Sequence, residues 1–240
     1  MNKTSPTNKP PLLQKHSVSG CTFSSEVYMM DCIQGMKEYP DKYFDLAVVD
    51  PPYGINFGEF NRTNKTGNGE RYKSNKYKNS SWDDGIPCDE YFIELQRVSK
   101  NQIVWGANYF PYLWVNGCKG FIFWHKGNPV PNFADGELAW TSFNKVAKMV
   151  DYRYYGNLEG KTSASDKIHP TQKPVALYDW VYANYATEGM KILDTHLGSG
   201  SSRIAANKAK LNFVGFEIDE EYFTKSEQRY ADFTSQLRLF

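Results

Sequence analysis

Apolar segments with the character of β-strands alternate along most of this chain with segments whose apolar residues recur at helical spacing. The strand-like segments are residues 26–31, 44–50, 101–106, 120–126, 136–143, 190–195 and 212–218. The helical segments are residues 88–100, 173–189, 199–210 and 219–237. Such alternation is typical of α/β proteins, in which helices cover both faces of a mostly parallel sheet. We therefore predict a seven-stranded Rossmann-like sheet, with an antiparallel edge near residues 121–143.

The length of the chain, 240 residues, allows a sizeable core and requires no second domain. Residues 1–24 begin with many Pro, Asn, Ser, Thr and Lys residues and lack an apolar signal core, which predicts a mobile tail before one domain at 25–240. No apolar run approaches membrane-spanning length, and the four cysteines lack the paired spacing of a zinc site. These features predict a reduced, cytoplasmic protein with no metal and no membrane partner.

Positive charge is concentrated in one segment, although the net charge is only +1. Residues 56–82 show neither strand nor helix periodicity and are longer than an ordinary connection. We predict a functional loop there, with an ordinary solvated or disordered loop as the alternative. Between residues 61 and 80 the only acid is Glu70. The candidate contacts of the loop with phosphate are its basic residues Arg62, Lys65, Arg71, Lys73, Lys76 and Lys78.

The strand-like segment 44–50 ends in Asp50, Pro51, Pro52 and Tyr53. Asp and Pro are ordinary turn residues, which explains the end of the strand but not the Tyr. Two prolines fix two φ angles and remove two amide donors, so that carbonyl oxygens at the mouth of the strand remain free to accept hydrogen bonds. Ligands of open α/β sheets bind beyond the carboxyl ends of the strands, where these residues would lie. The segment is either a turn or a rigid cluster of acceptors for a ligand.

A second candidate site begins at the Gly-rich turn with Gly198 and Gly200, which lies between a strand and a helix. Glycines allow a ligand to approach the backbone, and the helix presents its amino end to that ligand. Glu217, about twenty residues beyond the turn, could accept hydrogen bonds from ribose hydroxyls. Because Arg203 stands where a dinucleotide fingerprint has its third glycine, the pattern favours a nucleoside cofactor. A Gly-rich turn with a surface Glu is the alternative.

Three motifs follow one another along the chain: DPPYG at 50–54, HPTQKP at 169–174 and LDTHLGSGS at 193–201. Together and in this order they resemble the β-class amino DNA methyltransferases of the DPPY type, which use S-adenosylmethionine. The resemblance covers about residues 27–230. It implies the seven-stranded methyltransferase sheet, permuted so that the catalytic half precedes the cofactor-binding half.

The resemblance also implies which residues bind the cofactor. Asp31 and Cys32 would line the adenine site, and Glu217 with Ile218 would hold the ribose. Asp194, Gly198, Ser199, Gly200 and Ser201 would surround the methionine part. His169, Thr171 and Lys173 would close over it, and Asp50 is also counted among the cofactor-binding residues. Without the resemblance, His169 and Lys173 could instead cap the helix that begins near Pro174, and Asp31 could be a turn residue at the end of a strand.

The implied activity is site-specific methylation of adenine N6 in DNA, with the target base flipped out of the duplex. Asp50 and the carbonyl of Pro51 would accept the two amino hydrogens, Tyr53 would stack on the base, and Pro52 would help to hold them rigid. Asp50 favours adenine, since members that methylate cytosine N4 usually carry Ser there. Other aromatic residues are assigned to packing, among them Trp105, Tyr109, Trp124 and Trp140.

Several alternatives stay open from the sequence. They are a cytosine-N4 enzyme, a methyltransferase of RNA or of a protein amide, and a non-catalytic DNA-binding relative. Thr195 and His196 depart from the usual Pro-Phe of the family, and Met30 replaces a common glycine. Between Phe143 and His169 we find no segment large enough for a separate target-recognition domain. The resemblance implies a DNA partner, a restriction-modification setting in a bacterial or phage-infected cell, and either a monomer or a homodimer.

Overall fold

The computed structural model of the protein describes residues 23–55, 85–127, 134–153 and 167–237. Its strands are β1 (Ser25–Met29), β2 (Phe44–Val49), β3 (Ser99–Trp105), β4 (Phe121–His125), β5 (Gly136–Thr141), β6 (Lys148–Asp151), β7 (Lys191–Asp194) and β8 (Asn212–Glu217). Its helices are α1 (Cys32–Lys37), α3 (Asp89–Val98), α4 (Val175–Tyr185), α5 (Ser201–Lys208) and α6 (Glu220–Leu237). The short 3-10 helices η2 (Ala107–Tyr109) and η3 (Pro111–Trp114) follow β3.

The strands of the described residues form one eight-stranded sheet in the order β1-β8-β7-β2-β3-β5-β4-β6. β5 is antiparallel to both of its neighbours, and every other neighbouring pair is parallel. The predicted mostly parallel α/β sheet is therefore confirmed, with one strand more than the seven expected. The additional strand is β6, which has four residues and only one buried side chain, Val150. It is too short to show a strand pattern in the sequence.

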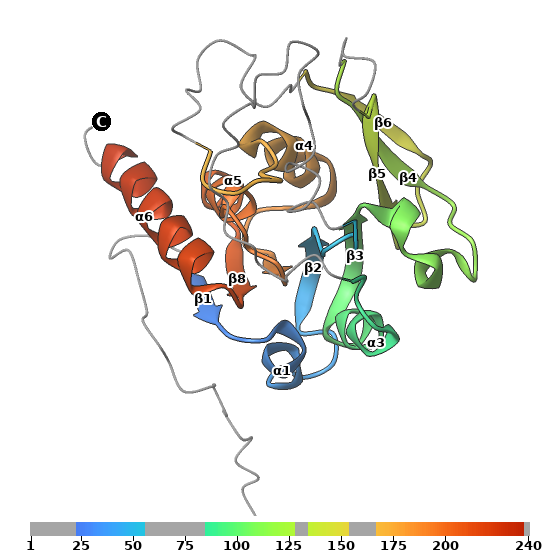
Figure 1. The fold of residues 1–240 in the computed structure, drawn as a ribbon, viewed down its shortest axis with the longest axis horizontal. Coiled ribbons are helices and arrows are strands. Elements are labelled where there is room, and N and C mark those ends of the chain that lie inside the picture. Colours follow the sequence, from blue (N-terminus) through green and yellow to red (C-terminus); the bar gives the residue numbers. More distant parts are fainter. Residues whose placement is uncertain (1–22, 56–84, 128–133, 154–166, 238–240) are drawn as a thin grey trace, which may run out of the picture.

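The antiparallel pair predicted near residues 121–143 consists of β4 and β5. These strands do not form the edge of the sheet, however. β5 pairs with β3 on its other side, and β6 forms the edge by pairing in parallel with β4 (Figure 1). The sequence pattern identified the pairing of neighbouring segments, but the order of strands depends on contacts with β3 and β6 that lie outside this hairpin.

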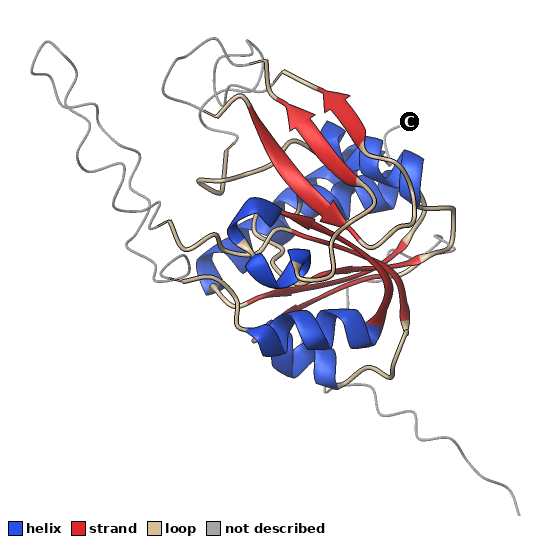
Figure 2. Cartoon of the chain, turned by 90° about the vertical axis from the view of Figure 1, so that its right-hand side faces the viewer, coloured by secondary structure: helices blue, strands red, loops and turns tan. Residues whose placement is uncertain are grey.

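Helices lie on both faces of the sheet (Figure 2). Alternate residues of β2 face opposite layers, as the two-residue repeat of a strand requires. Leu46 and Val48 belong to the core cluster that contains residues of α4 and α5. Ala47 and Val49 belong to the cluster that contains residues of α1 and α3. β2 is thus buried on both sides, which explains why its sequence is almost continuously apolar.

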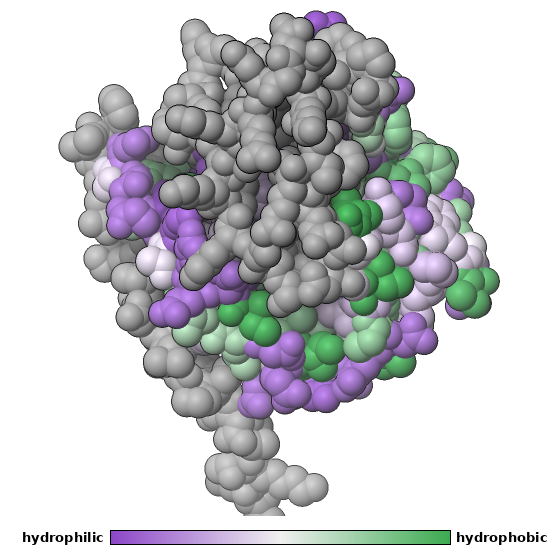
Figure 3. All heavy atoms as spheres, in the orientation of Figure 1, coloured by the Kyte–Doolittle hydropathy of each residue, from purple (hydrophilic) through white to green (hydrophobic). Residues whose placement is uncertain are grey.

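The predicted helices at 88–100, 173–189, 199–210 and 219–237 correspond to α3, α4, α5 and α6. α3 shows why these segments form helices. Asp89 and Glu90 lie in its first turn and Arg97 in its last, where the helix dipole favours each charge. Its buried side chains recur at helical spacing and are Tyr91, Phe92, Leu95 and Val98. α6 packs against α5 and β8, and hydrophilic residues cover its outer side (Figure 3).

The carboxyl ends of the parallel strands β1, β8, β7 and β2 meet at one edge of the sheet. Asp194 and Glu217 are the last residues of β7 and β8, and Asp50 directly follows β2. Three acids that are far apart in the sequence are therefore brought to the same side of the molecule. No helix among the described residues is long and apolar enough to cross a membrane.

Candidate active site

A cavity of about 180 Å³ lies where these strands end. Four segments supply most of its walls: the residues after β2, the residues before α4, the turn between β7 and α5, and the stretch from the end of β8 to the first turn of α6. The cavity brings together these predicted site residues: Asp50, Pro51, Pro52, Tyr53, His169, Thr171, Lys173, Gly198, Ser199, Ser201, Glu217 and Ile218. Among the predicted site residues that the structure describes, those that do not line the cavity are Asp31, Cys32, Asp194 and Gly200.

Asp50 lies at one end of this cavity with both carboxylate oxygens engaged. The hydroxyl of Tyr53 donates a hydrogen bond of 2.6 Å to Oδ1 of Asp50. Nζ of Lys173 lies 2.5 Å from Oδ2 of Asp50 and donates a hydrogen bond of 3.0 Å to the Tyr53 hydroxyl. The three side chains therefore form a closed triangle, and Lys173, which was expected near the methionine part of the cofactor, contacts Asp50.

Burial dominates the electrostatics of Asp50 and raises the pKa of its carboxyl above the ordinary value, against the opposing charge of Lys173. Burial alone would lower the pKa of Lys173, but the two carboxylates of Asp50 and Glu137 outweigh it and raise that pKa. Nζ of Lys173 lies 3.2 Å from Oε2 of Glu137. Lys173 is therefore a buried ammonium held between two acids. Glu137 is not a residue that the motifs identify.

Tyr53 is held in place by its surroundings as well as by its hydroxyl. Its ring stacks on that of Tyr109, with centroids 4.9 Å apart and an interplanar angle of 14°. Gly106 lies so close to the Tyr53 ring that any side chain at that position would collide with it, and its φ of +69° also favours glycine. Tyr109, which was assigned to packing, packs its ring on that of Tyr53 and remains 39% exposed. Trp105 and Trp124 are buried in the core as expected.

The Gly-rich turn is tied to the end of β8 through Glu217. Its Oε2 accepts a hydrogen bond of 2.8 Å from the backbone N–H of Gly198. Its Oε1 accepts from the backbone N–H groups of Ile218 and Asp219, at 3.0 and 2.9 Å. Burial raises the pKa of Glu217, and these three N–H groups oppose that rise. Because a carboxylate has about four acceptor positions, one remains for a ligand.

Both predicted glycines of the turn have left-handed backbone conformations, with φ of +51° at Gly198 and +70° at Gly200. Residues with a Cβ adopt such angles only at a cost, so the sequence needs glycine at both positions. Gly200 is the N-cap of α5 and does not line the cavity. The turn is also held by Arg229 of α6, whose Nη1 donates to the carbonyl of Ser199 at 2.7 Å and to Oγ of Ser201 at 2.9 Å.

Asp194 lies behind the turn and is 2% exposed. It accepts a hydrogen bond of 3.1 Å from the backbone N–H of His196 and a short one from the Ser202 hydroxyl. Burial raises the pKa of Asp194 to about 7, although both hydrogen bonds oppose this rise. Asp194 therefore supports the Gly-rich turn from below, and its charge changes near neutral pH.

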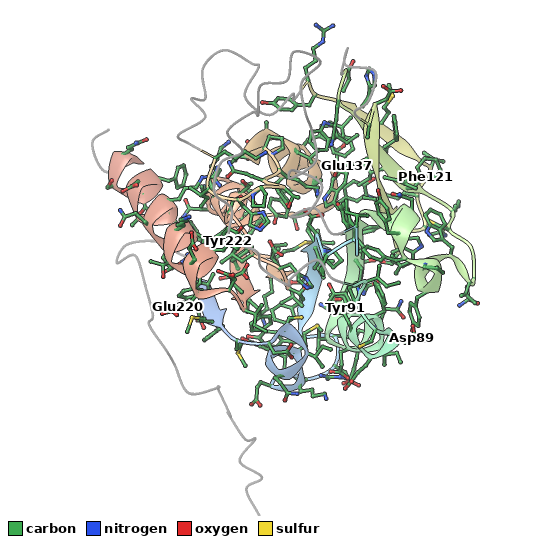
Figure 4. The ribbon with its side chains drawn as sticks, viewed as in Figure 1. Asp89, Tyr91, Phe121, Glu137, Glu220 and Tyr222 are labelled. Carbon is green, nitrogen blue, oxygen red and sulfur yellow. The ribbon has the colours of Figure 1, made fainter. Side chains whose placement is uncertain are left out.

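Two histidines face the cavity as neutral rings. Burial, with help from Lys167 and Lys173, lowers the pKa of His169 to about 3, and burial lowers that of His196 to about 4. The ring of His169 packs against Tyr222 with centroids 4.3 Å apart (Figure 4 labels Tyr222). Its Nδ1 lies 3.1 Å from Oγ1 of Thr171. No side chain caps α4, whose N-cap is Pro174, so His169 and Lys173 do not have the capping role left open by the sequence.

Asp31 and Cys32 lie at the start of α1, outside the cavity wall. The Asp31 carboxylate accepts a hydrogen bond of 2.9 Å from the backbone N–H of Gln34 and so caps α1. Burial raises the pKa of Cys32 to about 12, which keeps its thiol protonated. Locally, Asp31 therefore acts as the N-cap of α1, which is close to the turn-residue role that the sequence left open. Its contact with a cofactor stays a prediction.

The predicted basic loop, including Arg62, Lys65, Arg71, Lys73, Lys76 and Lys78, lies outside the described residues, as does most of the tail 1–24. The contacts of this loop with phosphate therefore stay a prediction.

Within the described ranges, no group of three or more His, Cys, Asp or Glu residues could hold a metal ion.

Comparison with known proteins places these features in context. Residues 113–228 match the DNA methylase family. The type II methyltransferase M.HinfI of Haemophilus influenzae is 25% identical over 252 residues, which cover 88% of this chain and 69% of that protein. The type II methyltransferase M2.MboI of Moraxella bovis is 24% identical over 249 residues, which cover 88% of this chain and 89% of that protein.

Two solved structures share the fold. The complex of M1.HpyAVI with SAM has a TM-score of 0.54 and 20% identity, covering 85% of this chain and 98% of that one. The PvuII DNA methyltransferase, described as cytosine-N4-specific, has a TM-score of 0.59 and 14% identity, covering 88% of this chain and 87% of that one.

Proposed function

This chain belongs to the β-class amino-methyltransferases, and on that premise we propose that it transfers a methyl group from S-adenosylmethionine to N6 of an adenine flipped out of duplex DNA. The observation that carries this proposal is one cavity lined by Asp50, Tyr53, Gly198 and Glu217. A socket for an amino group and a Gly-rich turn with a ribose acceptor thus share one space. The relatives named above are bacterial type II methyltransferases, which supports a role in restriction-modification.

The donors and acceptors of the cavity fit S-adenosylmethionine. Glu217 retains acceptor capacity for ribose hydroxyls, and the turn at Gly198 offers backbone without a side chain. Asp50 in the cavity wall and Asp194 behind the Gly-rich turn favour a cationic ligand when they are ionised, while His169 and His196 are neutral and do not repel it. S-adenosylmethionine supplies a methyl group activated by a positively charged sulfur. M1.HpyAVI, which has the same fold, was solved with this compound.

The residues after β2 perform the other half of the reaction. An exocyclic amine of a base is a weak nucleophile because its lone pair is delocalised into the ring. Asp50 and the Pro51 carbonyl would accept the amino hydrogens more strongly as the nitrogen becomes tetrahedral and positive during attack. The hydrogen bond from Tyr53 to Asp50 fixes the ring on which the base would stack. The two prolines keep these acceptors rigid.

The choice of adenine rests on Asp50. The PvuII enzyme is described as cytosine-N4-specific and shares the fold, so the fold does not separate the two bases. Cytosine-amino enzymes of this class usually carry Ser at the position of Asp50, and the carboxylate here favours adenine. We therefore retain cytosine N4 as the second candidate for the same site.

A transfer assay with S-adenosylmethionine labelled on the methyl group tests the proposal. Duplex DNA, RNA and a protein mixture are incubated separately with the purified protein, and the nucleosides are separated after digestion. We expect label in N6-methyladenine from duplex DNA alone. Label in N4-methylcytosine would keep the socket and change the base. Label in RNA or protein, or no label in any substrate, would contradict the proposed function.

A further inference from the structure

A row of four charged side chains with alternating sign ends at Asp50. Lys126, which follows β4, pairs with Oε1 of Glu137 in β5. Oε2 of Glu137 lies 3.2 Å from Nζ of Lys173, and this Nζ lies 2.5 Å from Oδ2 of Asp50. Figure 4 labels Glu137, which projects from β5 toward α4. Four separate segments of the chain thus meet in one row.

The row is enclosed to different degrees along its length. The side chain of Lys173 is 5% exposed, whereas Asp50, Glu137 and Lys126 are 17%, 21% and 20% exposed. A buried ammonium is stable only with close counter-charges, since removing one member of a buried pair leaves an uncompensated charge. The protein meets this need with two carboxylates, although one would form a neutral pair with Lys173. The second carboxylate, Glu137, therefore needs an explanation.

We propose that Glu137 is a positioning residue for methyl transfer, which shares the Lys173 ammonium with Asp50 so that the Asp50 carboxylate is oriented without being fully neutralised. This inference rests on the function proposed above. An ammonium bound to Asp50 alone would withdraw negative charge from the oxygens that must accept the hydrogens of the target amine. Glu137 draws part of that ammonium away, and Lys126 holds Glu137 in place from its other side.

The charges of the row agree with this geometry. Burial would raise the pKa of Glu137, but Lys173 and Lys126 outweigh it and lower that pKa to about 2, so Glu137 stays ionised. Glu137 in turn raises the pKa of Asp50, whereas Lys173 lowers it. Removing the charge of Glu137 should therefore lower the pKa of Asp50. Removing the charge of Lys126 should raise it, because Glu137 would then attract Lys173 more strongly.

Other titratable groups also face Asp50 and must be considered in any pH profile. Tyr53 after β2, Tyr91 of α3 and Tyr178 of α4 interact with it, and burial raises the pKa of each well above its ordinary value, so they stay neutral. Asp194 of β7 interacts with it too and has a pKa of about 7. Asp194 is unchanged in every variant of the row, so its titration affects all pH profiles alike. Only the differences between the profiles of the variants report on the row.

The experiment measures single-turnover methyl transfer to duplex DNA against pH for Glu137→Gln, Lys126→Gln and a control, Asp179→Asn. Asp179 forms a surface pair with Lys208 and does not line the cavity. We expect Glu137→Gln to lower the plateau rate by about tenfold, because Asp50, then paired more fully with Lys173, would accept the amino hydrogens more weakly in the transition state. The rate should fall at low pH as Asp50 is protonated. This acid limb of the pH–rate profile should move to lower pH in Glu137→Gln and to higher pH in Lys126→Gln, by roughly half a pH unit or more. The control should match the wild type.

Opposite shifts support the proposal, because loss of packing alone would not move the limb in two directions. A wild-type profile in Glu137→Gln, or limbs that shift the same way in both variants, would overturn it. If Glu137→Gln does not fold, Glu137→Asp and Lys126→Gln test the proposal instead. The acid limb of Glu137→Asp should lie at the wild-type pH, and that of Lys126→Gln should lie at a higher pH. If the wild type labels no DNA, the proposed function fails, and carbon NMR titration of the Asp50 carboxyl then tests the row by the same opposite shifts.

Discussion

The backbone N–H of Gly198 donates a hydrogen bond of 2.8 Å to Oε2 of Glu217. This bond joins the turn after β7 to the end of β8. The other carboxylate oxygen of Glu217 accepts from two further backbone N–H groups, those of Ile218 and Asp219. One side chain thus shapes the turn and keeps an acceptor position for a ribose hydroxyl, so both the turn and the cofactor should respond when it changes.

We predict that Glu217→Gln weakens S-adenosylmethionine binding by about tenfold to a hundredfold, since a hydrogen bond to a charged group contributes about 1.5–3 kcal/mol. An amide has one acceptor oxygen, so it cannot satisfy the three N–H groups and a ribose together. Calorimetric titration measures the affinity. The matched control is Glu188→Gln, an exposed acid outside the cavity that should leave affinity unchanged. Equal affinities in both variants would remove Glu217 from the cofactor site.

We predict that S-adenosylmethionine binds more tightly as pH rises toward 7 and that the affinity levels off above it. The pKa of Asp194 is raised to about 7 by burial, so its carboxyl is protonated below that pH in the free protein. A cationic ligand favours the carboxylate, and binding at low pH must therefore expel a proton, which costs up to about tenfold in affinity per pH unit. In Asp194→Asn the share of this dependence that belongs to Asp194 should be lost, so the rise in affinity toward pH 7 should be smaller than in the wild type. A wild-type affinity that is flat from about pH 5 to 8 contradicts this linkage.

Asp50→Ala should lose most methyl transfer while retaining cofactor binding. Removing an acceptor that strengthens in the transition state costs on the order of a hundredfold or more in rate. Lys173 keeps Glu137 as a counter-ion in this variant, so we expect the protein to remain folded. Asp50→Asn should lose less, because its amide oxygen still accepts one hydrogen bond. Single-turnover rates with melting curves distinguish these outcomes, and full activity in Asp50→Ala would exclude the amino-group socket.

The basic loop is tested through the salt dependence of DNA binding. Replacing Arg71, Lys73 and Lys76 by Gln should weaken binding and flatten the slope of log affinity against log salt by about one to three units, since each lost phosphate contact removes about one released counter-ion. The control is a triple replacement of surface lysines elsewhere, Lys37, Lys208 and Lys225, each of which pairs with an acid on the surface. An identical slope in both triple variants would indicate an ordinary solvated loop.

Local sequence patterns were sufficient for the features that depend on neighbouring residues. The apolar run of β2 and the helical spacing of α3 each record which faces are buried, so both elements could be predicted. Gly198 and Gly200 were recognisable because their left-handed φ angles are open to few other residues. The grouping of Asp50, Gly198 and Glu217 in one cavity followed from parallel strands whose carboxyl ends meet at one edge.

Contacts between distant segments were decided only by the tertiary structure. The place of Lys173 beside the methionine group stays a prediction, and the fold adds an ion pair between Lys173 and Asp50 that the sequence pattern does not show. Glu137 could have been noticed as a single acid in an apolar strand, yet its role depends on the insertion of β5 between β3 and β4. Tyr109 was assigned to packing, and only the fold shows that its packing partner is the ring of Tyr53. The physical reason is the same in each case: a local pattern records burial and backbone conformation, whereas strand order and register determine which side chains meet.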